Sequence, residues 1–347
     1  MIDFEIIRIL LLTFLSFVIA ILLTPLITHF LYKYRIAKSI RDEESTPIYS
    51  KLHAQKAGTP TMGGILIWGT LLIVILIFAA LPQLFPSSEF LSRLDFLSRA
   101  ETFLPLGALI ASALVGLVDD LFNTRRIGPS GGGLRIRHKI VLYFLIALFG
   151  AYWFYAKLDW TTIHVPFVGN FDIGIWYIPI FLFIIVATSF SVNEIDGLDG
   201  LAGGTLLAAF GAFGAIAFAQ GRFDLALFCG VIIGALLAFL WFNIPPARFF
   251  MGDTGSMSLG VTLGIIAMLT NSALLLPIIG FVFVIEALSV ILQIASKKIR
   301  KKKIFLSTPI HHHLEAKGWR ESKIVMRFWI IGGVTAVFGL ILALIDL

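Results

Sequence analysis

Cysteine and charge are both scarce in this sequence. The chain has a single cysteine, Cys229, among its 347 residues, which excludes an intrachain disulfide. Charged residues make up only 14% of the chain, whereas hydrophobic residues make up 58%. Soluble domains carry far more charge than this. We therefore expect the chain to lie in a membrane, with Cys229 packed between apolar helices.

Long polar stretches are missing as well, and no segment is typical of a separate soluble domain. The first apolar run ends in Lys33-Tyr34-Arg35 without a small-residue cleavage site, so we do not expect a cleavable signal peptide. The prediction is an all-α polytopic membrane protein with one domain, residues 1–347. About ten apolar runs are long enough to cross a bilayer: 4–31, 63–81, 103–118, 138–156, 174–192, 197–219, 223–242, 255–271, 273–296 and 325–346.

Basic residues are nearly absent from every second loop. With both termini placed outside, the internal loops and their edges hold 22 of the 27 Lys and Arg residues. This asymmetry predicts that the internal loops face the cytoplasm. The net charge of +6 then reflects a basic rim beside anionic lipid, and no nucleic-acid partner is expected. The internal loops are 32–62, 119–137, 193–196, 243–254 and 297–324.

Two external segments have recognisable patterns but no expected chemistry. Residues 82–102 show amphipathic spacing, which predicts an interfacial helix on the outer surface. The sequence HVPFVGNFDIG alternates around Gly169-Asn170, which predicts a small β-hairpin.

Acidic residues are missing between Asp224 and Glu286, with one exception, Asp253. A carboxylate beside hydrocarbon costs roughly 2.5–3.5 kcal/mol, so this position requires an explanation. The stretch before it contains Pro245 and Pro246, which interrupt a helix. We expect Asp253 to hold a metal ion at the start of the following helix. Glu286 lies in the middle of the next apolar run without an obvious partner, and its role is left open.

Four other polar groups lie at the cytoplasmic ends of apolar runs. Two adjacent aspartates, Asp119 and Asp120, repel each other unless a cation or basic side chains compensate; a solvated helix end is the alternative. Lys56 precedes Gly-Thr-Pro-Thr, either an anion site at a helix start or an ordinary loop. Three contiguous histidines, 311–313, suit phosphate binding or general base catalysis better than a zinc site.

The fourth group is the stretch SVNEIDGLDGLAGG. Asn193, Asp196 and Asp199 are three residues apart, so on a helical turn they would share one face. Such a face suits a cation or a polyhydroxylated ligand, and the alternative is capping together with small-residue packing. Carboxylates, lysines and histidines gathered on one side indicate Mg²⁺-assisted phosphoryl transfer, with one substrate from the cytosol and one from the lipid. Oxygen ligands and the absence of cysteine among them favour Mg²⁺ over zinc.

Five motifs carry a resemblance to a known family: KAGTPTMGG, VDD, NEIDGLDGLA, FNIPPARFFMGDTGS and TPIHHHLEAKGW. Together they resemble the phospho-N-acetylmuramoyl-pentapeptide transferases, a branch of the polyprenyl-phosphate N-acetylhexosamine-1-phosphate transferases. The resemblance spans essentially the whole chain. It implies that UDP-N-acetylmuramoyl-pentapeptide and undecaprenyl phosphate react to give lipid I and UMP, with Mg²⁺, at the cytoplasmic face of a bacterial inner membrane. A homodimer is a candidate assembly.

The resemblance also implies roles for individual residues. Asp119 and Asp120 match the catalytic aspartate pair, and Asp253 matches the magnesium ligand, with Asn193 as a candidate partner. The histidines match a motif near the pyrophosphate, namely His311, His312 and His313. The nucleotide pocket and further polar positions match Lys56, Asp196, Asp199, Asn243, Phe250, Lys139 and Gln293.

Two positions depart from the family pattern. Asn123 replaces the lysine of DDxxK, for which Arg125 or Arg126 could substitute, and Phe190 replaces an asparagine. Neither departure removes a candidate metal ligand. Two rival functions are kept: the same reaction with another UDP-N-acetylhexosamine, and a secondary transporter. A transporter would carry its polar residues near the bilayer midplane rather than at helix ends.

Overall fold

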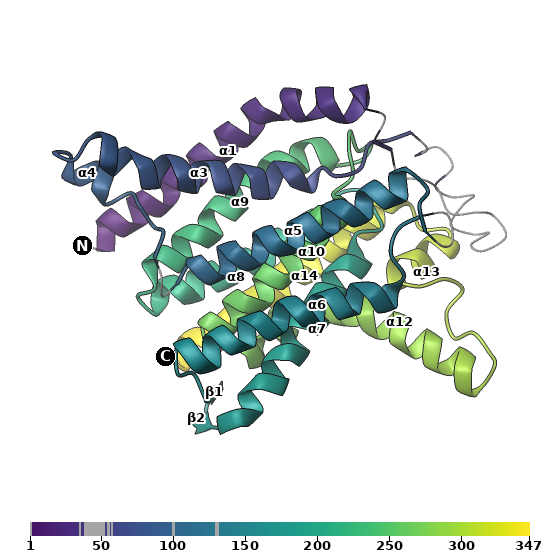
Figure 1. Ribbon diagram of the computed structural model, residues 1–347. Helices are drawn as coiled ribbons and strands as arrows, with labels where there is room; N and C mark the ends of the chain where they lie inside the picture. Colours follow the sequence, from purple (N-terminus) through teal and green to yellow (C-terminus); the bar gives the residue numbers. More distant parts are fainter. Residues whose placement is uncertain are drawn as a thin grey trace.

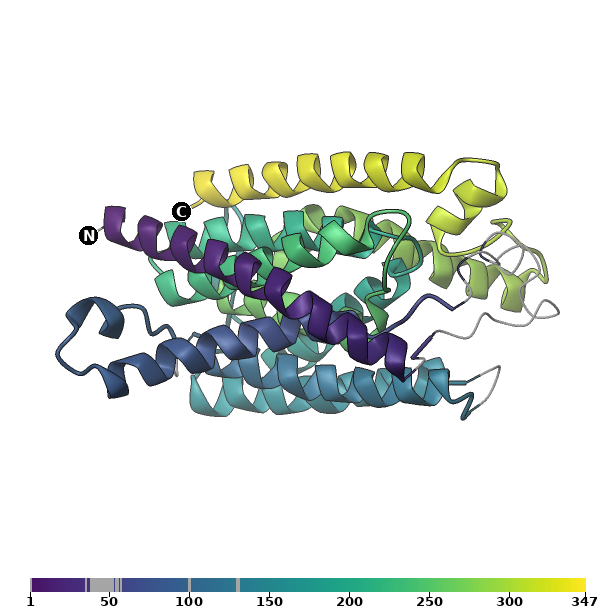
Figure 2. The ribbon, with the colours of Figure 1, turned by 90° about the horizontal axis from the view of Figure 1, so that it is seen from above.

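The protein is a bundle of long helices with one small hairpin (Figures 1 and 2). The computed structural model describes residues 2–34, 36–37, 53, 56, 58–98, 101–128 and 132–347. The long helices are α1 (Ile2–Lys33), α3 (Gly64–Leu84), α5 (Phe103–Thr124), α6 (Ile136–Tyr152), α7 (Tyr177–Ile195), α8 (Leu201–Ala219), α9 (Phe223–Asn243), α10 (Gly252–Leu269), α12 (Phe281–Ile299) and α14 (Glu321–Ile345). The short helices are α4 (Glu89–Ser92), α11 (Leu276–Ile279) and α13 (Ile310–Ala316).

The number of membrane-spanning helices agrees with the prediction. Within the described ranges, nine helices are long and apolar enough to cross a membrane, and a bent pair would make a tenth. That pair is Ala273–Ile279 followed by α12, with an angle of 83° between the two parts. The expected run 273–296 is thus present but bent, because the backbone leaves the helical region at Gly280.

Helix α10 lies at the centre of the bundle. Its most apolar window is 94% buried, compared with 22% for α1 and 28% for α14, which lie at the outside (Figure 2). The apolar sequence explains why these segments become helices, since a helix satisfies every backbone donor and acceptor within itself. Small residues explain how closely α10 packs: Gly116 of α5 lies against the backbone of Asp253 and Thr254.

Of the two segments predicted to be external, the hairpin is confirmed and the extent of the helix is corrected. Strands β1 (Thr162–Val165) and β2 (Gly169–Asp172) form the expected antiparallel hairpin, with Val165 opposite Gly169. The interfacial helix, by contrast, is reduced to the four residues of α4. Leu94 and Phe96 beyond it are buried, so the residues that follow α4 pack against the bundle.

The stretch NEIDGLDG is not one helical turn, and that expectation is wrong. Helix α7 ends at Ile195, Asp196 leaves the helical region, and α8 begins only at Leu201. Asn193 therefore belongs to the end of α7, whereas Asp199 belongs to the connecting loop. The two residues point to different parts of the site as a result.

Both termini lie at one end of the bundle, as Figures 1 and 2 agree. The opposite end carries α13, the end of α12 and the start of α10 (Figure 1). All the predicted site residues that occur at helix ends belong to this opposite end. The direction in which that end faces across the membrane remains a prediction from the basic loops.

Candidate active site

The start of α10 brings together two of the predicted carboxylates and one cation. Lys139 of α6 places its Nζ 2.5 Å from Asp253 Oδ2 and 2.7 Å from Asp119 Oδ2. Asp119 is 1% exposed, and it also accepts a hydrogen bond from the backbone N–H of Leu134. Two carboxylates from different helices thus share one ammonium group, which offsets their mutual repulsion.

The other oxygen of Asp253 binds Asn193. The Nδ2 group of Asn193 donates to Asp253 Oδ1 at 2.6 Å and to Ser256 Oγ at 2.9 Å. The predicted pairing of Asp253 with Asn193 is therefore a direct contact in the structure. It joins the end of α7 to the first turn of α10.

Asp120 faces a different group from its neighbour. Its two oxygens accept hydrogen bonds from the backbone N–H groups of Asp253, at 3.1 Å, and Thr254, at 3.0 Å. These N–H groups belong to the first turn of α10, where no helical partner exists for them. Asp120 thereby fixes the helix start that carries Asp253, and its charge is favourable at a helix N-terminus.

The group formed by Asp119, Asp253 and Asn193 fits a magnesium ion. Its available donors are carboxylate and amide oxygens, which Mg²⁺ prefers, and no described cysteine lies near. Charge supports the fit as well. Asp119 and Asp253 both contact Lys139, and the two carboxylates together carry one more charge than this lysine, which suits a further cation.

A second polar cluster lies around Lys56. Its Nζ is 2.7 Å from Asp199 Oδ1 and 2.5 Å from Glu321 Oε1. Burial acts to lower the pKa of Lys56, but the carboxylates of Asp199 and Glu321 outweigh it and raise the pKa above its ordinary value. Lys56 therefore stays charged. Sequence reasoning missed Glu321, which belongs to the first turn of α14.

Asn243 and Phe250 flank the loop between α9 and α10. The amide of Asn243 accepts from the N–H of Gly200 and donates to the carbonyl of Phe249, both at 2.8 Å. The ring of Phe250 lies 6.0 Å from Lys56 Nζ, a cation–π contact. Asp199 Oδ2 accepts from the N–H of Ala247 in the same loop. The predicted nucleotide-pocket residues Lys56, Asp199, Asn243 and Phe250 are thus neighbours.

The three histidines differ in their surroundings. His311 Nδ1 lies 3.0 Å from Glu286 Oε2, and His312 Nδ1 lies 2.7 Å from Glu315 Oε2. Burial, followed by the neighbouring His311, lowers the pKa of His312 to about 3, so this ring is neutral at pH 7. The rings of His311 and His312 are in contact, with centroids 4.1 Å apart.

His313 and Gln293 contact the loop before α13. His313 Nδ1 accepts from the N–H of Leu306, and Gln293 bonds the backbone of Ile304 and Phe305. Their contribution to substrate binding stays a prediction. In the structure both side chains hold the loop that leads into the histidine helix.

Sequence reasoning missed His53 and Glu315. Glu315 Oε2 accepts from both His312 and His53, with His53 Nε2 at 3.2 Å. Burial raises the pKa of Glu315, but the hydrogen bonds from these two histidines outweigh it and lower the pKa to about 2. Within the described chain, the ligand atoms of His53, His312 and Glu315 lie within 4.8 Å of one another and could hold a metal ion. The motif HHHLE was the available signal for Glu315.

The structure partly explains how the chain accommodates the two departures from the family pattern. Arg125 and Arg126 are exposed, whereas Lys139 reaches the aspartates, so the cation beside the pair comes from α6. Asn123 lies next to Gly132 and Gly133, and Phe190 is half-buried. Asp196 lies at the end of α7, close in sequence to the other pocket residues, and its predicted role is untested.

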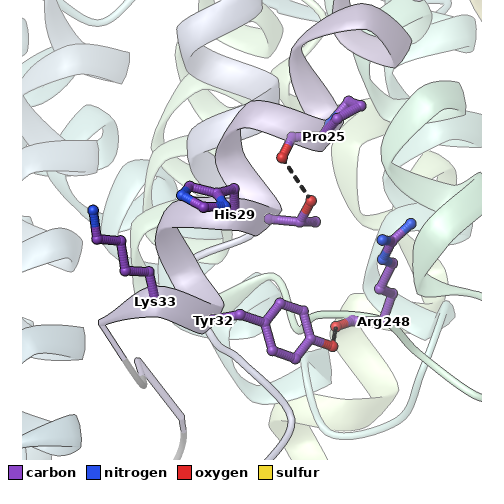
Figure 3. Close-up of a pocket in the computed structure, with 6 residues that line it drawn as sticks. Pro25, His29, Tyr32, Lys33 and Arg248 are labelled. Carbon is purple, nitrogen blue, oxygen red and sulfur yellow. Dashed lines mark hydrogen bonds between the residues drawn. The ribbon is translucent and has the colours of Figure 1, made fainter.

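A cavity of about 510 Å³ lies apart from these clusters (Figure 3). It is open and basic, and it lies where the end of α1 meets the loop before α10. Tyr32 crosses it and donates its hydroxyl to the carbonyl of Arg248 at 3.1 Å. None of the predicted site residues contributes to its lining, which consists of Pro25, Thr28, His29, Tyr32, Lys33 and Arg248.

Known proteins resemble this chain over nearly its whole length. Residues 102–271 match the model of glycosyl transferase family 4, and residues 56–67 match phospho-N-acetylmuramoyl-pentapeptide-transferase signature 1. The chain is 39% identical over 328 residues to the phospho-N-acetylmuramoyl-pentapeptide-transferase of Geobacillus sp. (strain WCH70), covering 94% of this chain and 95% of that protein. It is 37% identical over 351 residues to the one from Chloroflexus aggregans, covering 97% and 90%. Since these similarities extend over nearly the full length of both chains, the chain belongs to the phospho-N-acetylmuramoyl-pentapeptide transferase family.

Proposed function

We propose that the chain transfers phospho-N-acetylmuramoyl-pentapeptide from its UDP conjugate to undecaprenyl phosphate, giving lipid I and UMP. The observation that carries this proposal is the shared contact of Asp119 and Asp253 with Lys139, supported by Asn193. A site of carboxylates and one lysine suits a reaction between two phosphate groups, in which charge must be balanced.

The reaction forms a bond from an oxygen of the lipid phosphate to the sugar-linked phosphorus of the UDP conjugate. The bond between that phosphorus and the oxygen of the departing UMP breaks. Asp253 would hold Mg²⁺ with Asn193 nearby, and the ion would supply neutralisation of phosphate charge. Lys139 would balance the carboxylates.

We assign different tasks to the two adjacent aspartates. Asp119 faces the group of reacting charges, so it is our candidate for accepting the proton of the lipid phosphate. Asp120 binds the first N–H groups of α10 and so positions Asp253. Lys56, Asp199, Asn243 and Phe250 would bind the uridine part, with the ring of Phe250 available for stacking on the base.

The site should open to the cytoplasm of a bacterial cell. Its residues lie at one end of the bundle, and the basic loops of the sequence belong to the same end. The water-soluble UDP conjugate could then arrive from the cytosol, while undecaprenyl phosphate arrives through the bilayer. This placement supports a transferase over a transporter, whose binding residues would lie near mid-membrane.

The test is UMP release by the purified protein in lipid vesicles. We expect release with UDP-N-acetylmuramoyl-pentapeptide, undecaprenyl phosphate and Mg²⁺, and loss of release on chelation of the metal. The Asp253→Asn variant should be at least about a hundredfold slower, because even residues that only support a metal ligand contribute 10–100-fold. Release with UDP-N-acetylglucosamine instead would favour the rival sugar substrate, and uptake without bond cleavage would favour a transporter.

A further inference from the structure

Glu286 is a buried carboxylate in the longer part of the bent, apolar helix pair 273–299. It belongs to α12, and its side chain is 0% exposed, as is that of its partner His311. An acidic side chain at such a place is costly, and in membrane proteins it usually indicates a functional site with a specific partner. The site described above does not explain why the chain keeps it.

The pair of Glu286 and His311 is only half satisfied. Glu286 Oε2 and His311 Nδ1 are 3.0 Å apart, but Glu286 Oε1 and His311 Nε2 have no hydrogen-bond partner in the described structure. Nearly all buried polar atoms do have partners, so each exception requires an explanation. Replacing the pair by apolar residues would remove this cost, which indicates that the two groups are kept for their chemistry.

The free nitrogen of His311 points at the loop between α7 and α8. A Cβ atom built on Gly197 would lie 2.3 Å from His311 Nε2 and 3.1 Å from His312 Nε2. Only the missing side chain of Gly197 lets these two nitrogens approach the loop that carries Asp196 and Asp199. Both rings therefore present Nε2 to the same stretch of backbone.

We propose that Glu286 is the positioning residue of His311 in the transfer reaction. Its carboxylate accepts a hydrogen bond from His311 Nδ1–H, which fixes the ring orientation and leaves the lone pair on Nε2. Nε2 is then the atom of the ring able to accept a proton or a hydrogen bond, for example from a protonated phosphate oxygen of the substrate. Glu315 makes the same contact with Nδ1 of His312, so two adjacent histidines are oriented alike. The inference rests on the proposed function.

The first test compares Glu286→Gln with a matched control on the same helix. Gln has the same shape, but its amide can bond either tautomer of His311. We expect a fall in kcat of about 10–100-fold, the usual effect of losing a supporting partner, with KM for the UDP conjugate within about twofold. The control is Ser289→Ala, whose buried hydroxyl only bonds the carbonyl of Glu286 itself, and it should retain full turnover.

A double variant separates positioning from general stability. If Glu286 acts through His311, then adding Glu286→Gln to His311→Ala should cause no further fall in kcat. A purely structural role would give additive losses, and so would overturn the proposal. The thermal midpoint shows whether Glu286→Gln folds. If it does not fold, Glu286→Asp replaces it in the test, because aspartate keeps a carboxylate at this position. We expect the turnover of Glu286→Asp to exceed that of His311→Ala.

A spectroscopic measurement makes the test independent of turnover. In protein carrying ¹⁵N-histidine, with His311→Ala identifying the signal, we expect His311 to be protonated at Nδ1. In Glu286→Gln the signal should move towards a mixture of tautomers. An unchanged tautomer together with unchanged kcat would overturn the inference while wild-type UMP release still supported the proposed function. Absence of UMP release in the wild type would count against the function alone.

Discussion

Lys139 is the residue that allows Asp119 and Asp253 to lie close together. Its ammonium group contacts both carboxylates within 2.7 Å, and its side chain is only 16% exposed. Removing one partner of a buried charge pair costs more than the pair contributes, because the remaining charge stays buried without compensation. The same residue therefore affects both stability and charge balance in the site.

We expect Lys139→Gln to lower the free energy of unfolding by about 3 kcal/mol and to abolish UMP release. Added Mg²⁺ should raise the thermal midpoint of this variant more than that of the wild type, since a divalent ion would compensate the two carboxylates. Thermal unfolding in detergent with and without Mg²⁺ measures both effects. Lys157→Gln, at the exposed end of the same membrane span, is the control and should behave as the wild type. If Mg²⁺ raised the thermal midpoints of Lys139→Gln and the wild type equally, the assigned metal site would be contradicted.

Gly197 is a second position at which the site depends on one particular residue. Its missing side chain makes room for the Nε2 atoms of His311 and His312. We expect Gly197→Ala to displace the histidine helix and to reduce kcat by about a hundredfold, since displacements near 1 Å can cost that much. Gly211→Ala in α8 has no heavy atom within 4 Å of the new Cβ and should leave kcat unchanged. Steady-state UMP release compares the two, and full activity of Gly197→Ala would show that the close approach is unnecessary.

Helix α10 positions the site because its neighbours pack directly against its first turn. Asp120 binds its N-terminal amides, Asn193 binds Asp253, and Gly116 contacts the backbone of Asp253 and Thr254. Interfaces between membrane helices depend on such small residues, because lipid offers no hydrophobic drive for association. The distance between α5 and α10 thus determines the distance between Asp119 and Asp253.

At the scale of elements, we expect Gly116→Ala to separate α5 from α10. A Cβ atom at this position would lie 2.3 Å from the carbonyl oxygen of Asp253. Relieving this clash requires the backbone of α5 or of α10 to move. The thermal midpoint should fall, with a cost of about 1–3 kcal/mol for overpacking, and UMP release should be lost. Gly107→Ala is the matched control on the same helix, because its Cβ would meet no atom within 4 Å. Equal thermal midpoints for the two variants would mean that the helices tolerate a wider spacing.

At the scale of the whole molecule, an ion pair joins the hairpin to the residue after α14, at the end of the bundle opposite the site. His164 of the hairpin lies 2.6 Å from Asp346, just beyond α14. The hydrogen bond that His164 donates to Asp346 raises the pKa of His164. This hydrogen bond and the one from the N–H of Phe167 lower the pKa of Asp346. The stabilisation from His164 is lost as pH rises through its raised pKa. The stabilisation from Asp346 is lost as pH falls through its lowered pKa.

The pair should therefore stabilise the protein most between about pH 4 and pH 6.5, the ordinary pKa values of the two groups. We expect Asp346→Asn to lower the thermal midpoint at pH 5.5 and to have a smaller effect at pH 9. Asp172→Asn in the same hairpin is the control: its carboxylate accepts from the N–H of Gly174, so its effect should persist at pH 9. A constant effect of Asp346→Asn from pH 5.5 to 9 would rule out the protonated histidine as its cause.

The sequence by itself determined the class of the molecule and supplied most of the candidate site residues. Apolar runs, a turn at Gly169-Asn170 and polar groups at helix ends are local patterns, so spans, hairpin and candidate residues could be predicted from them. Spacing misled between Asn193 and Asp199, where the helix ends at Ile195. It also gave no warning that residues 273–299 bend at Gly280.

Only the tertiary structure decided which residue meets which. Lys139 and Asp253 are 114 positions apart, and His53 and Glu315 are 262 apart. Such contacts depend on how closely helices pack, and therefore on glycines such as Gly116. The sequence around a glycine does not reveal which helix will pack against it. For the same reason, the sequence alone assigned no role to Glu286. Its partner His311 belongs to α13, the short helix that follows the loop after α12.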